Sequence, residues 1–196
     1  MEKPRFINIY TESSPNPNSQ KFVLNFYLLE NMSFDFPSAE GTENCPIAKA
    51  LFDQFDFIEG VFIASNFITI TKSASSDWFE INTPVKEFIK NYIQEEKPLF
   101  LEGIKQEVAK EDIKENVTET PTDAQIKAVL NDYVRPAVES DGGAISFHSF
   151  DEGVVKVELK GACSGCPSST VTLKSGIENL LKRMVPGVEK VEAVEL

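Results

Sequence analysis

Two cysteines carry the clearest chemistry in this sequence. Cys163 and Cys166 form a CxxC motif, and the chain of 196 residues holds one further cysteine, Cys45. A glycine between the pair can take backbone angles closed to other residues, so the loop lets both sulfur atoms turn toward one centre. Three cysteines are too few for a disulfide framework. The motif therefore indicates a metal or redox site in a reducing compartment.

The position of the motif also favours metal binding. It lies between a predicted strand and a predicted helix that begins at Pro167. The unpaired N–H groups and partial positive charge of a helix N-terminus stabilise thiolate. Thiolate is the form that binds iron or zinc.

The number of ligands points to two copies of the chain. A [4Fe–4S] cluster or a structural zinc usually takes four protein ligands. Cys45 lies more than 100 residues before the motif, and His148 is the only histidine. Two copies related by a twofold axis would bring two CxxC loops together and complete a four-sulfur site. A cluster held between subunits is released when they part, which suits a carrier.

Other reactive residue types have plainer interpretations. Cys45 is interpreted as a small, partly buried residue. His148 is interpreted as a surface or hairpin-packing residue with no acid or nucleophile partner, so triad chemistry is unsupported. Asp141-Gly142-Gly143 is interpreted as a helix stop.

Apolar periodicity places these residues in an α+β protein. In residues 1–96 it predicts strands, one hairpin and two helices. The predicted elements are strands near 6–10 and 22–26, a helix after Pro46, a hairpin over 60–71 and a helix that opens at Thr83-Pro84. Residues 97–120 lose this periodicity and are rich in acids, which is typical of a solvated linker.

Residues 121–196 follow a helix–hairpin–helix–strand order. The first helix begins near Pro121 and is expected to kink at Pro136. A hairpin turns at 151–153, and a Val-rich closing strand spans 188–194. The fold class is therefore α+β, with two small mixed domains joined by an acidic linker.

Composition excludes some partners. The chain has 31 acidic and 19 basic residues and a formal charge of −12, so neither nucleic acid nor a membrane surface is an expected partner. No apolar run approaches the roughly 20 residues of a membrane span. The first residues resemble neither a signal peptide nor a transit peptide, and a cytoplasmic protein is expected.

Longer stretches of sequence resemble a known family. The run Leu159-Lys-Gly-Ala-Cys-Ser-Gly-Cys-Pro-Ser-Ser-Thr-Val-Thr-Leu-Lys-Ser-Gly-Ile-Glu, with Val134-Arg-Pro-Ala and Asp141-Gly-Gly before it, resembles the NifU C-terminal domain. The first block resembles the Nfu N-terminal domain through Pro15-Asn-Pro-Asn-Ser, Ala48-Lys-Ala-Leu-Phe, Phe67-Ile-Thr-Ile-Thr-Lys and Asp77-Trp.

This resemblance implies a non-enzymatic iron–sulfur cluster carrier. Cys163 and Cys166 would bind a [4Fe–4S] cluster across a homodimer, with a [2Fe–2S] form left open. The cluster would come from assembly factors and pass to apo iron–sulfur proteins. Two alternatives stay open: a thioredoxin-like thiol–disulfide protein and a zinc-bridged interaction module.

Overall fold

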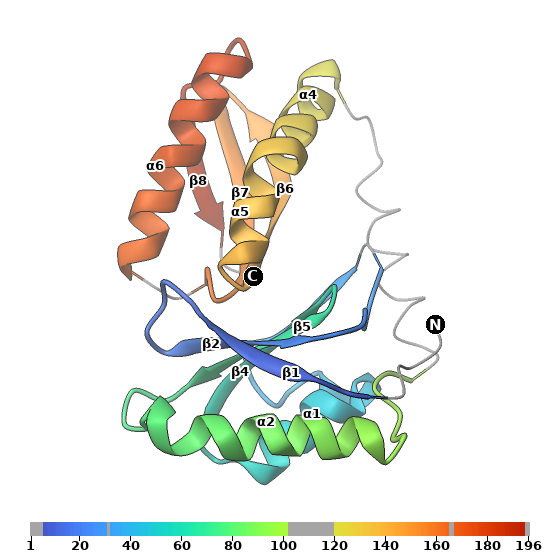
Figure 1. Ribbon diagram of the computed structural model, residues 1–196. Coiled ribbons are helices and arrows are strands. Elements are labelled where there is room, and N and C mark those ends of the chain that lie inside the picture. The colour runs from blue at the N-terminus through green and yellow to red at the C-terminus, as the bar shows by residue number, and fades with distance from the viewer. Residues whose placement is uncertain (1–5, 31, 102–119, 165–166, 195–196) are drawn as a thin grey trace.

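The computed structural model describes residues 6–30, 32–101, 120–164 and 167–194. Two sheets, each with its own helices, make up these parts of the chain, and one half of the molecule stands on the other (Figure 1). The predicted α+β class with two mixed domains is confirmed. None of the described helices is both long and apolar enough to cross a membrane.

The N-terminal domain is a five-stranded antiparallel sheet with two helices on one face (Figure 1). The strand order is β1-β2-β5-β4-β3. The elements are β1 (Ile9–Ser13), β2 (Ser19–Leu24), β3 (Ser33–Phe36), the short 3-10 helix η1 (Thr42–Asn44), α1 (Pro46–Gln54), β4 (Ile58–Ala64), β5 (Phe67–Lys72) and α2 (Trp78–Gln94).

Alternation along the strands decides which side chains meet the helices. Phe22 and Leu24 of β2 and Ile68 of β5 point into the main core with residues of α1 and α2. Their neighbours point the other way, so Lys21, Val23, Asp35, Phe62, Ala64, Phe67 and Thr69 lie on what we call the outer face.

Two features of this domain differ from the sequence prediction. Helix α2 begins at Trp78, and Pro84, predicted at its start, lies inside it. The start is fixed by Asp77, whose side chain accepts a hydrogen bond from the Phe79 N–H (2.9 Å). Strand β3 was not predicted, although its Phe34 and Phe36 alternate with polar residues.

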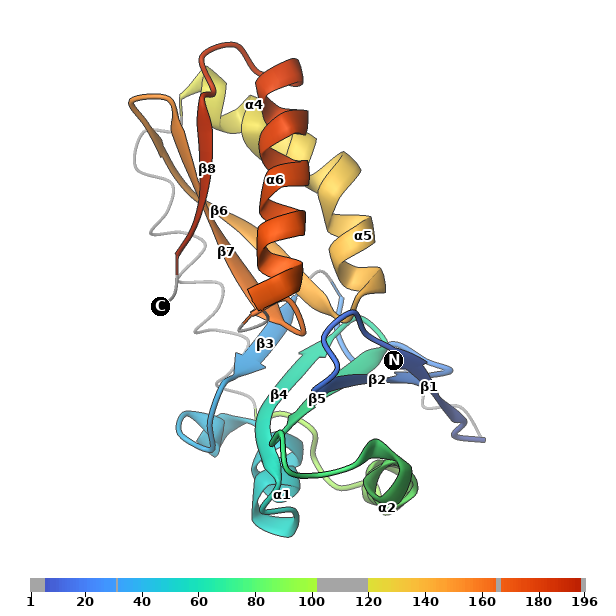
Figure 2. The same cartoon turned by 90° about the vertical axis from the view of Figure 1, so that its left-hand side faces the viewer.

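The C-terminal domain packs its helices on one face of a three-stranded sheet (Figure 2). Strand β6 forms a hairpin with β7, and β8 pairs with β7 in parallel. The elements are α4 (Pro121–Val129), the π-helical turn η2 (Leu130–Val134), α5 (Arg135–Ser140), β6 (Gly143–Asp151), β7 (Val154–Gly161), α6 (Pro167–Met184) and β8 (Lys190–Val194).

The order of elements in this domain confirms the predicted helix–hairpin–helix–strand module. The first helix is interrupted by the π-helical turn just before Pro136, as expected where proline removes a backbone donor. The predicted acidic linker, 97–120, lies mostly outside the described residues, and the limits 1–96 and 121–196 stay predictions.

In the described parts of the chain, the two domains meet at the outer face of the N-terminal sheet. The outer face of the N-terminal sheet lies against the end of the C-terminal domain where β7 stops and α5 passes into β6 (Figures 1 and 2). The core of the N-terminal domain lies on the opposite side of its sheet, with α1 and α2. The contact therefore covers the end of the C-terminal domain that carries the CxxC motif.

Candidate functional site

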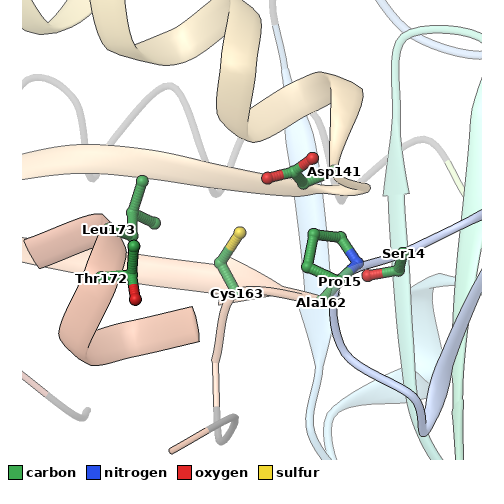
Figure 3. A pocket seen from close by; sticks show the side chains of 7 residues that line it. All are labelled: Ser14, Pro15, Asp141, Ala162, Cys163, Thr172 and Leu173. Carbon is green, nitrogen blue, oxygen red and sulfur yellow. The ribbon is translucent and has the colours of Figure 1, made fainter. Parts of the chain in front are cut away.

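Cys163 lies just beyond the end of β7, in the turn that leads to α6. The helix begins at Pro167, as predicted from the sequence. The side chain of Cys163 is 4% exposed and belongs to the core of the C-terminal domain. Its sulfur lies between residues of α6 on one side and Pro15 of the N-terminal domain on the other (Figure 3). Cys166 falls outside the described residues.

The two glycines of Asp141-Gly142-Gly143 have different roles. Gly142 has a φ of 87° and follows the end of α5, so the predicted helix stop is confirmed. Gly143 instead makes room for the cysteine, because a Cβ there would lie 2.8 Å from Cys163 Sγ and 2.5 Å from the Lys160 carbonyl oxygen. Sequence reasoning missed this second role.

A cavity of about 380 Å³ opens beside Cys163 (Figure 3), within the size range of small-ligand sites. Burial raises the pKa of the Asp141 carboxyl on its wall, and nearby Lys21 lowers it. The described residues that line the cavity come from both domains: Ser14, Pro15, Asp141, Ala162, Cys163, Thr172 and Leu173. The surroundings of Cys163 are thus built partly by the N-terminal domain.

Side chains of the N-terminal domain bind backbone groups next to Cys163, both in the turn before α6 and just before the start of β6. The Thr69 hydroxyl donates a hydrogen bond to the Gly142 carbonyl (2.8 Å). The Asn16 amide donates to the Ala162 carbonyl (3.3 Å). Thr69 and Asn16 are 1% and 6% exposed, so these contacts are buried, where an unpaired polar group would be costly.

Lys21 reaches the same end of the C-terminal domain from β2. Its ammonium donates a hydrogen bond to the Ser140 carbonyl (3.4 Å) and pairs with Glu12 (3.1 Å). It also lies 4.5 Å from the centre of the Phe67 ring. These contacts explain how a lysine 8% exposed is accommodated at the domain contact.

Apolar packing supports the same contact. The Phe62 ring lies directly against Gly161, where a Cβ would come within 2.7 Å of the ring. Gly161 has a φ of 65°, which favours glycine independently. Val23, Ala64 and Phe67 form a small buried cluster with Phe62, against which Ala144 of β6 packs.

Asp35 of β3 accepts a hydrogen bond from the Gly161 N–H (3.3 Å). Burial raises the pKa of its carboxyl to about 6, against the opposing effects of that hydrogen bond and of Lys160, while Glu158 adds to the rise. The ionised form therefore destabilises the folded, docked chain above pH 6. Sequence reasoning missed Asp35, although the Phe34-Asp35-Phe36 alternation could have placed it opposite the core.

This raised pKa predicts a pH-dependent effect of Asp35→Asn. The folded pKa lies above the unfolded value near 4, so wild-type stability falls relative to the variant as pH rises from about 4 to 6. Above pH 6 the variant should be more stable by at most about 3 kcal/mol. Chemical denaturation across this range measures the difference. Asp56→Asn, at an exposed position, is the control. If the free energy of unfolding of Asp35→Asn changes with pH in parallel with that of the wild type, the prediction is contradicted.

Cys45 and His148 do not join Cys163. Cys45 is 0% exposed on the helix-covered side of the N-terminal sheet, where its thiol contacts the Leu99 carbonyl (3.6 Å). Burial raises its pKa to about 11, which disfavours thiolate. His148 is exposed on β6 beside Ser149. Among the described residues, no group of three or more His, Cys, Asp or Glu side chains could hold a metal ion.

Comparison with known proteins supplies the family. Residues 9–96 match the model of the scaffold protein Nfu/NifU N-terminal domain, and residues 126–192 match the NifU-like domain. The chain is 40% identical over 194 residues to NifU-like protein 5, mitochondrial, of Arabidopsis thaliana, covering 98% of this chain and 70% of that protein. The chain belongs to the Nfu/NifU-like family. The resemblance inferred from the sequence is confirmed.

One further curated relative and one solved structure are also similar to this chain. The NFU1 iron-sulfur cluster scaffold homolog, mitochondrial, of Drosophila willistoni is 39% identical over 191 residues, or 97% of this chain and 64% of that protein. A solution structure of a NifU-like protein from Saccharomyces cerevisiae is 20% identical, with a TM-score of 0.44, and covers 52% of this chain and 91% of that one. This Nfu-type chain thus spans about two thirds of the length of the curated relatives.

The predicted cytoplasmic location is wrong by the same comparison. The relatives from Arabidopsis and Drosophila are named as mitochondrial proteins. The prediction rested on the residues at the start of the sequence and on cysteine content. Reduced thiols do not identify a particular compartment.

Proposed function

We propose that this Nfu-type protein carries an iron–sulfur cluster and does not catalyse a reaction. Cys163 and Cys166 of two copies hold a [4Fe–4S] cluster between them, and the cluster passes to apo iron–sulfur proteins after delivery by assembly factors. The domains are 1–96 and the cluster-binding 121–196, joined by the acidic linker 97–120. Relatives named as iron–sulfur cluster scaffolds support this role.

The strongest support for the proposal is the number of side chains in the sequence that could bind a soft metal. The chain has three cysteines and one histidine. Cys45 is buried on the far side of the N-terminal sheet, and His148 is exposed on β6. The CxxC pair is what remains for a soft metal, and it is half of the four ligands that a cubane cluster usually takes. A second copy supplies the other half.

Anaerobic purification, with iron, sulfide, zinc and native mass measured on one sample, tests the proposal. The expected result is a brown dimer with about four iron and four sulfide per two chains, whereas a [2Fe–2S] form would show about two of each. A strictly monomeric loaded protein would contradict the shared site. Zinc without iron or sulfide would favour the zinc-bridged module. Disulfide reductase activity that needs Cys163 would favour the thioredoxin-like alternative.

A further inference from the structure

The contact between the two domains is concentrated around the cysteine. Thr69, Lys21 and Asn16 each donate a hydrogen bond to a backbone carbonyl there, and Asp35 accepts one from a backbone N–H. Their partners are backbone atoms of residues 140, 142, 161 and 162. We call residues 140–143 and 161–163 the cysteine end of the NifU-like domain. The outer face of the N-terminal sheet is thus bound to the two segments that position Cys163.

This arrangement conflicts with a cluster shared by two copies. Each thiolate sulfur must come within about 2.3 Å of the metal, the length of a metal–thiolate bond. Cys163 is 4% exposed, and Ser14 and Pro15 of the N-terminal domain form one wall of the cavity beside it (Figure 3). A second copy cannot bring its own cysteines to Cys163 from that side while the N-terminal domain remains docked.

We propose that the outer face is a reversible cap for the cysteine end of its own chain, and that the capped form cannot share a cluster with a second copy. The inference rests on the proposed function and names its regulation. The cluster-free chain is closed, with the N-terminal domain covering Cys163. The N-terminal domain must undock before two copies hold a cluster between their CxxC loops.

The nature of the contact suits reversible docking. Among the described residues, the contact consists of hydrogen bonds to backbone atoms and a small apolar cluster, as in contacts that domains within one chain form and release. Its hydrogen bonds run to backbone atoms, so the cap recognises the shape of the cysteine end. Because cap and target belong to one chain, redocking is intramolecular and needs no high concentration.

Docking and cluster binding are then linked. If the cluster binds only undocked chains, its apparent affinity is reduced by the fraction of chains that are undocked. By the same linkage, a cluster-loaded dimer holds the N-terminal domain away from the cysteine end. Weakening the cap should therefore raise both the accessibility of Cys163 in the cluster-free chain and the rate at which it takes up a cluster.

Thr69→Lys is the decisive variant. Thr69 is 1% exposed, bonds the Gly142 carbonyl across the contact and points away from the main core, so a lysine there blocks docking without entering that core. Thr71→Lys is the matched control, because Thr71 lies two residues along the same strand and bonds Ser19 within the N-terminal sheet. Thr69→Val replaces the hydroxyl by a methyl group and so removes the hydrogen bond to Gly142. This variant is used if the lysine variant does not fold.

The first readout is the rate of Cys163 alkylation in the reduced, cluster-free full chain, resolved by peptide mass. We expect Thr69→Lys to raise this rate more than roughly tenfold and Thr69→Val by roughly two- to tenfold, as loss of one hydrogen bond implies. Small-angle scattering should show a larger radius of gyration for Thr69→Lys. Thr71→Lys should match wild type in both measurements. Unchanged alkylation and scattering in both Thr69 variants would overturn the cap.

The second readout is the rate of cluster uptake and dimer formation after anaerobic addition of iron and sulfide. We expect Thr69→Lys to load faster than wild type and Thr71→Lys to load at the wild-type rate. If Thr69→Lys is alkylated faster but takes up the cluster at the wild-type rate, the proposal that a capped chain cannot share a cluster is overturned. If neither the wild type nor any variant binds a cluster, the proposed function is wrong. The alkylation rates then still decide whether the cap exists.

Discussion

Replacing Cys163 or Cys166 by alanine is expected to remove the cluster and with it the dimer. Each substitution deletes two of the four sulfur ligands of a shared site, since both copies carry it. A cubane cluster left with two protein thiolates is not held stably. Iron and sulfide should fall to background, and native mass should show a monomer at concentrations where the wild type is a loaded dimer.

Cys45→Ser is the matched control for these variants. Cys45 is buried in the core of the N-terminal domain, on the opposite side of its sheet from the cysteine end. Its replacement can lower stability, although the Leu99 carbonyl that its thiol contacts can also accept a hydroxyl hydrogen bond. Iron per chain should equal the wild-type value.

Circular dichroism separates ligand loss from unfolding. Cys163→Ala removes a sulfur atom from a packed core and should cost about 1 kcal/mol, which leaves the domain folded. Full iron loading in both Cys163→Ala and Cys166→Ala would rule out the proposed ligands. A loss of iron in Cys45→Ser would instead place the third thiol in the site.

The local elements of this fold could be predicted from the sequence because their signals are local. The hairpin of β6 and β7 follows from two alternating runs and a glycine turn, and helix α6 begins at the proline that follows the motif. Strand β3 is four residues long, so its Phe34-Asp35-Phe36 alternation gives a weaker signal than the longer strands do. Asp77, the N-cap residue of α2, precedes Pro84 by more than a turn of helix. A prediction based on the proline alone therefore placed the start of α2 too late in the sequence.

The contact between the domains could not be predicted from periodicity. Its hydrogen bonds join residues 73 to 146 positions apart, and no local rule pairs them. A partial signal exists in β4 and β5, where Val61-Phe62-Ile63-Ala64 and Phe67-Ile68 are apolar on both faces. Strands buried on both faces read as continuous apolar runs, so the sequence does indicate that something covers the outer face. It does not indicate what.

Gly143 shows why the candidate site was predicted only in part. The pair Gly142-Gly143 is sufficiently explained as a helix stop, and that explanation holds for Gly142. The need for glycine at the next position appears only once β6 is paired with β7. In that pairing Gly143 faces Gly161, and the sulfur of Cys163 fills the space where a Cβ would stand. The constraint belongs to the folded domain.

Gly143→Ala should therefore destabilise the NifU-like domain and disturb the site. The new methyl would meet the Lys160 carbonyl oxygen at 2.5 Å and Cys163 Sγ at 2.8 Å, and the backbone atom cannot turn aside as a side chain would. Forcing a methyl into a packed core typically costs about 1–3 kcal/mol. Denaturant unfolding of the cluster-free chain should show this loss, and iron loading should fall because Cys163 is displaced.

Gly176→Ala is the control that separates this clash from the general effect of replacing glycine. Gly176 is exposed in helix α6, and a Cβ there would meet nothing within 4 Å. Alanine in a helix interior is favoured over glycine by about 1 kcal/mol, so this variant should gain stability and keep its iron. If Gly143→Ala lowers the free energy of unfolding while Gly176→Ala raises it, the loss at Gly143 comes from contact of the new methyl with the Cys163 sulfur and the Lys160 carbonyl oxygen. A Gly143→Ala protein as stable and as well loaded as wild type would show that Cys163 does not depend on that space.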